Sequence, residues 1–326
     1  MAKSKNISGL HCSGPAEKMV RLVLRTQLKS MCVLRKKALD WKDPEGVHDM
    51  RVLSRRLRSA VSDFKPYFRK STLPRRKLVA IAKKLGAVRD EDVTLPALDE
   101  LKGQASGPAA AGIEMLAEEH KRHRKNARAA LKSAIKPATV AEFRKEFLSK
   151  LRELKVVPGR KVGAKETEGV PFTFSCLGVD IVKARLEEFC LASSDLYLPL
   201  ENKKLHELRI LAKRLRYAIE MFETCWGDEM KETTKEISLL QTSLGELHDC
   251  DVWIDNLGAR LKQVSGKKKN EDNVRLIEGA GWLLKHFARE RMEHYQDTLS
   301  RWQRWEADGF LERLKSSLDR EGSFRP

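Results

Sequence analysis

The sequence predicts an all-α protein built from two tandem antiparallel helical bundles, of four to five helices each, in a pseudo-twofold arrangement. Three observations predict this fold class. Apolar residues recur with helical spacing along nearly the whole chain, and no stretch shows the alternation of a strand. Two motifs occur twice in the same order. A segment of glycines, prolines and mixed charge separates the two copies.

The duplication is visible in two pairs of segments. The first pair is VHDMRVLSRRLRSAVSDFKPYF at 47–68 and LHELRILAKRLRYAIEMFETCW at 205–226. The second pair is LGAVRDEDV at 85–93 and LGELHDCDV at 244–252. Because both pairs keep the same order and nearly the same offset, we infer a duplicated unit and not a chance match.

The breaks in periodicity set the domain organisation. We expect a flexible N-terminus at 1–14, a first bundle at 15–154, a linker at 155–176 and a second bundle at 177–320, together one domain. A further loop is expected in each repeat, at 103–112 and at 265–273. The helices expected between these breaks cover about 15–40, 46–69, 72–101, 112–136, 138–153, 177–195, 201–226, 228–263, 273–299 and 300–319.

The chain carries a large positive charge. Its 326 residues include 64 Lys and Arg against 46 Asp and Glu, a formal net charge of +18. Such a charge predicts a polyanionic partner and does not specify a fold. No apolar run approaches the ~18 residues of a membrane span, and the N-terminus lacks the apolar segment of a signal peptide. We therefore expect a cytoplasmic protein that makes no membrane contact, of an oligomeric state that the sequence leaves open.

The cysteines predict neither a metal site nor a disulfide. None of the six forms a C-x-x-C pair, and no neighbouring histidines complete a zinc spacing. We expect reduced, mostly buried thiols, as in a cytosolic protein, and no metal or other cofactor. The six are Cys12, Cys32, Cys176, Cys190, Cys225 and Cys250.

The first motif places basic side chains on one face of its helix. On a helical wheel, four of them fall within roughly 80° of arc, opposite a continuous apolar face, with a fifth at the flank. The second copy repeats this pattern. We call these two sets the basic stripes: His48, Arg51, Arg55 and Arg58 with Arg56 flanking, and His206, Arg209, Lys213 and Arg216 with Arg214 flanking.

A charged face opposite an apolar face is most often a solvated surface, but three features favour a ligand here. The charges are concentrated, they lack acidic i,i+4 partners, and the arrangement is kept in both repeats. Arginine also suits phosphate, because its planar guanidinium can donate to two oxygens at once. His48 and His206 lead their stripes, so each is a phosphate contact or part of a structural hydrogen-bond network.

Further residues are candidates for the site or its support. The recurring acids of the second motif could bind a metal, but we expect them to pair with stripe arginines and hold their rotamers; they are Asp90, Asp92, Asp249 and Asp251. Possible additional ligand contacts are Arg21, Arg25, Lys29, Lys83, Lys84, Arg89 and His248.

The two motifs resemble those of the CHAD family, whose name stands for conserved histidine α-helical domain. The patterns H-x-x-R-[VI]-L-x-[RK]-R-L-R and L-G-x-x-[RH]-D-x-D-V each occur twice, and the resemblance covers about residues 15–320. It implies two bundles around a basic central cavity that binds inorganic polyphosphate without catalysis, often at polyphosphate granules, with the basic stripes lining the cavity. One departure is His248, where arginine is usual.

Two other functions remain as alternatives. A nucleic-acid-binding protein fits the charge, but aromatic residues are only 6% of the chain and none interleaves with the basic stripes to stack on bases. Weak non-specific nucleic-acid binding is compatible with either reading. A metal-dependent phosphohydrolase of the HD type would use His48, Asp49, His206, His248 and Asp249, but the neighbouring arginines would repel a divalent metal. We expect a binding protein and not an enzyme.

Overall fold

The computed structural model describes residues 7–69, 72–158, 172–226, 229–265 and 270–323. Within these ranges it contains ten α-helices, five from each repeat, which confirms the all-α fold. The first repeat contains α1 (Ala16–Val33), α2 (Pro44–Phe64), α3 (Arg75–Gln104), α4 (Gly107–Ala134) and α5 (Pro137–Glu153). The second contains α6 (Phe174–Ala192), α7 (Asn202–Met221), α8 (Glu229–Ser265), α9 (Glu271–Ala307) and α10 (Phe310–Ser323).

Short elements accompany these helices. The four 3₁₀ turns of the described ranges are η1 (Lys37–Leu39), η2 (Lys65–Tyr67), η3 (Ser193–Tyr197) and η4 (Glu223–Cys225). The strands β1 (Phe68–Arg69) and β2 (Lys155–Val156) pair antiparallel, which the sequence did not predict. They are two residues long each, too short for an alternating pattern to register in the sequence.

Several helix boundaries differ from those expected. The first helix ends at Val33 instead of near residue 40, and α6 begins at Phe174, within the segment expected to be linker. The loop expected at 103–112 shrinks to two residues, because the Pro108 and Ala109–Ala111 segment forms the first turn of α4, where proline is tolerated and alanine is favoured. The break expected at 299/300 lies instead after Ala307, where Gly309 adopts a φ of 61° that glycine accepts readily.

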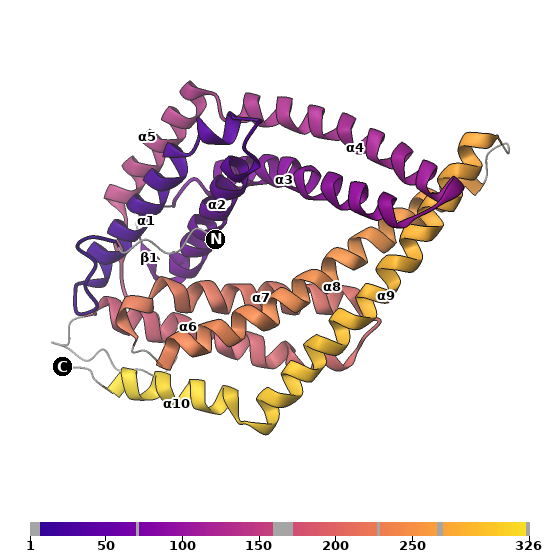
Figure 1. The fold of residues 1–326 in the computed structure, drawn as a ribbon. Coiled ribbons are helices and arrows are strands. Elements are labelled where there is room, and N and C mark those ends of the chain that lie inside the picture. Colours follow the sequence, from indigo (N-terminus) through magenta and orange to yellow (C-terminus); the bar gives the residue numbers. More distant parts are fainter. Residues whose placement is uncertain (1–6, 70–71, 159–171, 227–228, 266–269, 324–326) are drawn as a thin grey trace.

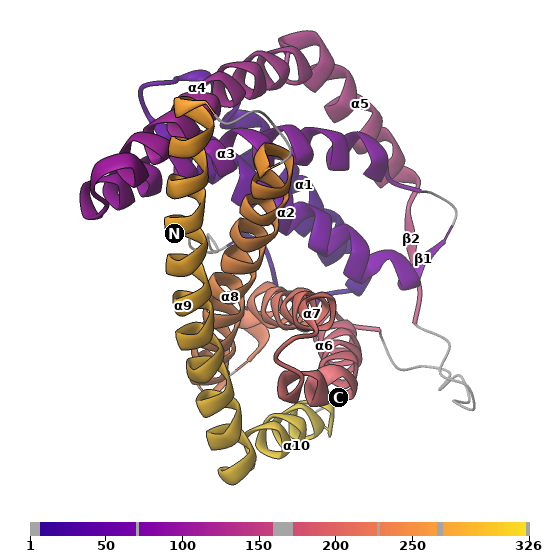
Figure 2. The ribbon, with the colours of Figure 1, turned by 90° about the vertical axis from the view of Figure 1, so that its right-hand side faces the viewer.

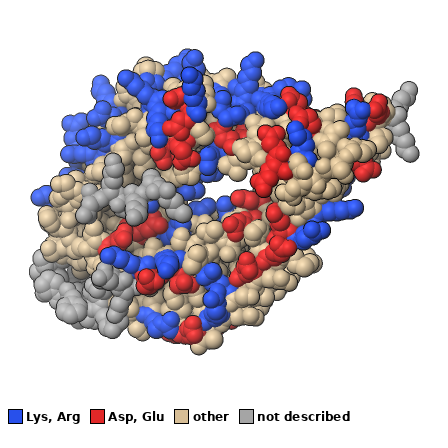
Figure 3. Space-filling model, viewed as in Figure 1, with Lys and Arg blue, Asp and Glu red and all other residues tan. Residues whose placement is uncertain are grey.

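The helices surround a central opening (Figure 1), and the view turned by 90° shows α8 and α9 side by side along one edge of the molecule (Figure 2). The hairpins α3–α4 and α8–α9 extend from the remaining helices, and α4 packs on α9 where they meet. Gly112 and Gly279 allow this close approach: a Cβ on Gly279 would lie 2.6 Å from the carbonyl carbon of Gly112, and one on Gly112 would overlap the backbone of Arg275. The side chains do not fill this opening in the space-filling view (Figure 3). Lys and Arg side chains lie at its rim, and acidic side chains gather to its right.

Two hydrophobic cores hold this arrangement, and both repeats contribute to each. The larger joins α1, α2 and α5 to α6, α7 and α10, with Phe64 and Phe222 in edge-to-face contact at 6.2 Å between ring centroids. The smaller joins the ends of α3 and α8 to α4 and α9, around the fully buried Leu98 and Leu283. The repeats therefore stabilise each other through shared apolar burial.

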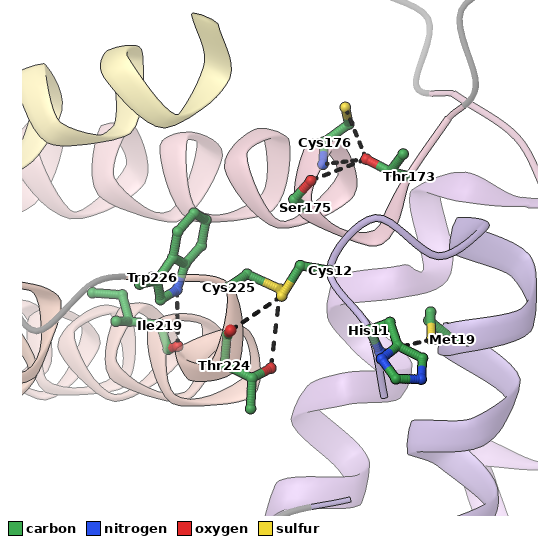
Figure 4. The surroundings of a disulfide bond; sticks show 10 residues. All are labelled: His11, Cys12, Met19, Thr173, Ser175, Cys176, Ile219, Thr224, Cys225 and Trp226. Atoms are coloured by element: carbon green, nitrogen blue, oxygen red, sulfur yellow. Dashed lines mark hydrogen bonds between the residues drawn. A yellow bond between two sulfur atoms is a disulfide. The ribbon is translucent and has the colours of Figure 1, made fainter. Parts of the chain in front are cut away.

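A disulfide ties the N-terminal segment to the second repeat (Figure 4). Cys12 and Cys225 are bonded, with 5.3 Å between their Cα atoms, and the amide of Ser175 donates to the carbonyl of Cys12 at 2.9 Å. The expectation that all six thiols are reduced was wrong. The expectation of mostly buried thiols was wrong as well, since Cys250 is buried whereas Cys32, Cys176 and Cys190 are only partly covered. No helix in the described ranges has the length and apolar content to span a membrane.

Candidate polyanion-binding site

The basic stripes lie on α2 and α7, which pack against each other. Asp43 caps α2 by accepting a hydrogen bond from the amide of Glu45 at 2.9 Å, and Pro44 occupies the first turn. The apolar faces are in the core: Met50, Leu57, Leu208 and Leu215 are fully buried. Burial of these faces fixes the rotation of both helices, so that the opposite, basic faces are directed away from the core.

The two basic stripes come close enough for their charges to repel each other. Burial lowers the pKa of Lys213 to about 7, and the further causes are Arg209 on its own helix, Arg55 and Arg51 on α2, and then Arg216. Burial also lowers the pKa of Arg55, with Arg51 and Arg216 acting in the same direction. Arginine stays charged nonetheless. The stripes are therefore one cluster of cations, although they come from different repeats.

The second motifs support the two central arginines in matching ways. The Arg51 guanidinium lies 3.5 Å from the Asp90 carboxylate, and that of Arg209 lies 3.9 Å from Asp249. The motif glycines lie beside the same side chains, since a Cβ on Gly86 would be 3.8 Å from Arg51 Nε. The matching distance from Gly245 to Arg209 Nε is 3.7 Å. Both repeats thus hold their arginine against the neighbouring helix by one acid and one glycine.

The expectation that Asp92 and Asp251 pair with stripe arginines was wrong. Asp92 accepts from Arg124 and Arg128 of α4, the former at 2.6 Å, and Asp251 accepts from Arg291 of α9 at 2.6 Å. Asp92 and Asp251 follow Asp90 and Asp249 by two residues, which corresponds to a rotation of about 200° around the helix. The later acids of each motif therefore face the second helix of their hairpin, and both are buried.

Burial and neighbouring cations lower the pKa of each site histidine. Burial, followed by the charge of Arg89, lowers the pKa of His48. Burial and then Arg209 lower that of His206. The pKa of His248 falls to about 4, mainly through burial, with further contributions from His206 and Arg209. His206 and His248 also contact each other, with 3.1 Å between their Nδ1 atoms, so at most one of these nitrogens carries a proton there.

Four stripe arginines have a buried donor that no described residue satisfies. These are the Nε atoms of Arg55, Arg56, Arg209 and Arg216. The Nε atoms of Arg21, Arg128, Arg260 and Arg301, outside the stripes, are buried and unpaired as well. Unpaired Nε donors therefore do not distinguish the stripes from the other arginines of the described residues.

The remaining basic residues of the stripes are engaged to different extents. Arg56 and Arg216 both reach Glu220, at 3.1 Å and 3.4 Å, and Arg216 also donates to Ser238. Since Glu220 lies four residues after Arg216, the expectation that the stripes lack acidic i,i+4 partners was wrong for Arg216. Burial, followed by the charges of Arg75 and Arg51, lowers the pKa of Arg58. Arg214, at the flank of the second stripe, is exposed. The structure therefore brings together seven basic residues that form no ion pair closer than 3.5 Å with an acid of the described residues. They are His48, Arg51, Arg55, Arg58, His206, Arg209 and Lys213.

The additional candidates divide in the same way. Arg21 caps the end of α5, donating to the carbonyls of Arg152 and Leu154, and pairs with Glu17, so it supports the fold. Arg89 lies 4.0 Å from Glu45 beside His48. The structure leaves four candidates exposed: Arg25 and Lys29 on α1, and Lys83 and Lys84 on α3.

Sequence reasoning missed Tyr217 and Glu220. The Tyr217 ring lies between the stripes, with the guanidinium carbons of Arg55 and Arg216 at 5.6 Å and 5.0 Å from its centroid. Tyr217 corresponds to Ser59 in the first repeat, so the duplication gave no signal. The motif glycines could have been found, because they recur in both copies.

A separate pocket lies between α4 and the segment before α2. It has a volume of about 420 Å³ and is lined by Trp41, Lys121, Arg124, Lys125, Arg128, Ala129 and Lys132. Its arginines already pair with Asp92, and Arg128 stacks over Trp41 at 5.1 Å. The two central stripe arginines have longer distances to their acids, 3.5 Å for Arg51–Asp90 and 3.9 Å for Arg209–Asp249, so the stripes are the better candidate for a polyanion site.

A metal fits poorly among the stripe histidines. Glu45, His48 and Asp49 have ligand atoms within 4.8 Å of one another. Arg89 lies beside Glu45, and its charge would repel a cation at this place.

Comparison with known proteins places the chain in a family. The model of the CHAD domain matches residues 22–258. Among solved structures, the chain is similar to the CHAD domain from the plant Ricinus communis, with a TM-score of 0.67 and 18% identity over 98% of this chain and 96% of that one. It is also similar to PptA from Streptomyces chartreusis, with a TM-score of 0.63 and 16% identity over 89% of this chain and 100% of that one. None of the curated proteins matches the chain. Since the family model spans well over half of its length, the chain belongs to the CHAD domain family.

Proposed function

We propose that this protein binds inorganic polyphosphate between its two basic stripes and does so without catalysis. The observation that supports this most is the convergence of Arg51 and Arg55 with Arg209 and Lys213: burial first, and then these arginines, lower the pKa of Lys213 to about 7. A polyanion that passes between α2 and α7 would relieve the repulsion within this cluster. Following the family resemblance, we further propose that binding serves to place the protein at cytoplasmic polyphosphate granules.

A phosphate polymer suits this site better than a nucleic acid. The cluster offers closely spaced charges from two helices, and the aromatic ring between the stripes, Tyr217, is buried and covered by arginines. Base recognition needs exposed aromatic faces or groups that reach base edges. Linear polyphosphate needs only phosphate contacts, which arginine forks and a lysine supply.

The test compares binding of long-chain polyphosphate with binding of single-stranded RNA of equal charge, by titration calorimetry at physiological salt. We expect submicromolar polyphosphate affinity and much weaker RNA binding. Affinity should fall with salt at a slope of roughly −0.7 to −0.9 per phosphate contact, by analogy with DNA. Equal affinity for both polymers would favour generic polyanion binding, and no binding of either would refute the assignment.

A charge-matched pair of variants locates the site. Combined alanine replacement of Arg51, Arg55, Arg209 and Lys213 should abolish polyphosphate binding with the helical circular dichroism unchanged. The control replaces four exposed cations on other helices, which are Arg122, Lys145, Lys285 and Arg289. It removes the same number of basic side chains and should weaken binding only slightly. Equal loss in both variants would mean that net charge and not the stripes determines affinity, and loss of helicity would mean that the stripe residues are structural.

A further inference from the structure

The second motif carries three consecutive acidic residues in its first copy, and each has a different environment. Asp90 pairs with stripe arginine Arg51, and Asp92 pairs with Arg124 and Arg128. Glu91, between them, is directed at two histidines of α4. The Glu91 Oε2 lies 2.7 Å from Nδ1 of His120, and Oε1 lies 4.0 Å from Nδ1 of His123.

These three side chains form a compact set of metal ligands. Their ligand atoms all lie within 4.8 Å of one another. His120 and His123 are three residues apart on one helix, so both rings extend from the same face of α4 toward α3. A metal with bonds of about 2.1 Å needs ligand atoms roughly 3.3 Å apart. Small side-chain rotations would therefore suffice: the His120–Glu91 contact lengthens slightly and the His123–Glu91 contact shortens.

The charges around this set favour a cation. In the part of the chain that the structure describes, the ion-pair partners of Glu91 are these two histidines, with no lysine or arginine among them. Three of the nearby cations pair with other acids: Arg124 with Asp92, Arg260 with Glu119 and Lys121 with Glu118. Arg122 and Lys125 are exposed on α4, where solvent screens their charges. The environment thus differs from that of His48, where Arg89 stands close by.

Two of the three ligands are also held in place by packing. The side chain of Glu91 is only 16% exposed and that of His120 is 28% exposed. Trp253 of α8 packs against the His120 ring, with 6.1 Å between ring centroids. The His123 ring lies edge-on to the His120 ring, with 5.7 Å between centroids. Both α3 and α4 belong to the smaller core, so a bound ion would meet a largely preformed site.

The second repeat has a related but different cluster at the matching position. Glu91 corresponds to Cys250 in the motif, and Cys250 lies with Glu290 and His294 of α9, again within 4.8 Å. The middle residue of the D-x-D pattern thus faces the second helix of its hairpin in both repeats. The ligand types differ, because the second cluster replaces a carboxylate and an imidazole by a buried thiol and a carboxylate.

We infer that Glu91, His120 and His123 bind a divalent transition-metal ion of the Zn²⁺ class, with water in the remaining coordination positions. Two imidazoles and one carboxylate suit Zn²⁺, Co²⁺ or Ni²⁺, whereas Mg²⁺ and Ca²⁺ prefer oxygen ligands throughout. This inference does not depend on polyphosphate binding and predicts a site in the protein free of polymer.

The experiment titrates the chelator-treated, polyphosphate-free protein with Zn²⁺ by calorimetry and with Co²⁺ by absorption spectroscopy. We expect micromolar Zn²⁺ binding that weakens roughly 10- to 100-fold in Glu91→Gln, which keeps the shape of the side chain, and in His123→Ala. His123 is 63% exposed, so its replacement should leave the fold intact, and circular dichroism checks this. The matched control His294→Ala removes a ligand of the second cluster and should leave this site unchanged.

The Co²⁺ spectrum separates the two clusters. A site of nitrogen and oxygen ligands shows d–d bands without thiolate-to-metal charge transfer. A charge-transfer band that disappears in Cys250→Ser, with binding unaffected by Glu91→Gln, would overturn the assignment in favour of the second cluster. The absence of Zn²⁺ binding to the folded wild-type protein would overturn it altogether.

Discussion

The affinity for polyphosphate should fall as the pH rises above 7, because Lys213 loses its charge in the free protein. Its pKa of about 7 results from burial and from cations on both helices, Arg209 and Arg216 on α7 and Arg51 and Arg55 on α2. The acids that pair with these arginines are Asp90 with Arg51, Asp249 with Arg209 and Glu220 with Arg216. A bound polyanion favours the protonated amine, so the pKa in the complex must be higher than in the free protein.

The magnitude follows from the fraction of free protein that has a charged Lys213. With a pKa of about 7, roughly one tenth is charged at pH 8 and one hundredth at pH 9. If the pKa in the complex returns to its ordinary range, affinity falls about tenfold per pH unit between pH 8 and 9 and levels off below about pH 6.5. Binding at pH 8 should take up about 0.9 proton.

Proton uptake is measured by calorimetry at fixed salt in two buffers that differ in ionisation enthalpy. Lys213→Arg keeps the positive charge without a titration in this range, so its affinity should be nearly constant from pH 8 to 9. Both proteins contain the same site histidines, and the difference between them isolates Lys213. Equal proton uptake by the wild type and Lys213→Arg at pH 8 to 9 would refute the reasoning.

Three further outcomes are expected. Gly279→Ala places a methyl group against the backbone of Gly112 and should lower the free energy of unfolding by about 1–3 kcal/mol. In the control Gly281→Ala the new methyl has no heavy atom within 4 Å, so this variant should not be destabilised. Thermal denaturation measures both. Cys12→Ser removes a crosslink between residues 213 apart and should lower unfolding free energy by roughly 2–4 kcal/mol in oxidising buffer but not in reducing buffer. Asp251→Asn weakens a buried pair with Arg291 and should cost roughly 3 kcal/mol of stability in denaturant titrations, whereas the exposed Asp249→Asn should change stability little. A similar loss in both aspartate variants would contradict the different environments assigned to the two acids.

The sequence predicts what depends on period and repetition. The apolar face of α2 fixes which side of the helix carries Arg51 and Arg55, and the second copy repeats this for Arg209 and Lys213. Both stripes were therefore visible before the fold was known. Their distance from one another was not, because it depends on how α2 packs on α7, a contact between residues far apart in the chain.

Contacts between distant residues account for the other differences. Cys12 and Cys225 have no local motif, so nothing in the spacing indicates that they bond. Asp92 lies in the same motif as Asp90, yet the helical turn directs it to α4 instead of α2. Glu220 accepts from an arginine of each repeat, and the first copy has no counterpart that would have marked it. Helix positions could be read locally, whereas pairings required the tertiary structure.

As the pH rises, Lys213 changes the stability of the free protein and its affinity for polyphosphate in opposite directions. A pKa lowered from 10.5 to about 7 corresponds to roughly 5 kcal/mol of disfavoured charge. Between these two values the unfolded chain binds the proton and the folded chain does not, so this residue makes the free protein more stable as pH rises. Polyphosphate favours the charged form, so over the same range its affinity falls. The shared cores of the two repeats supply the stability that keeps the cations together, and the ligand then gains from the repulsion it relieves.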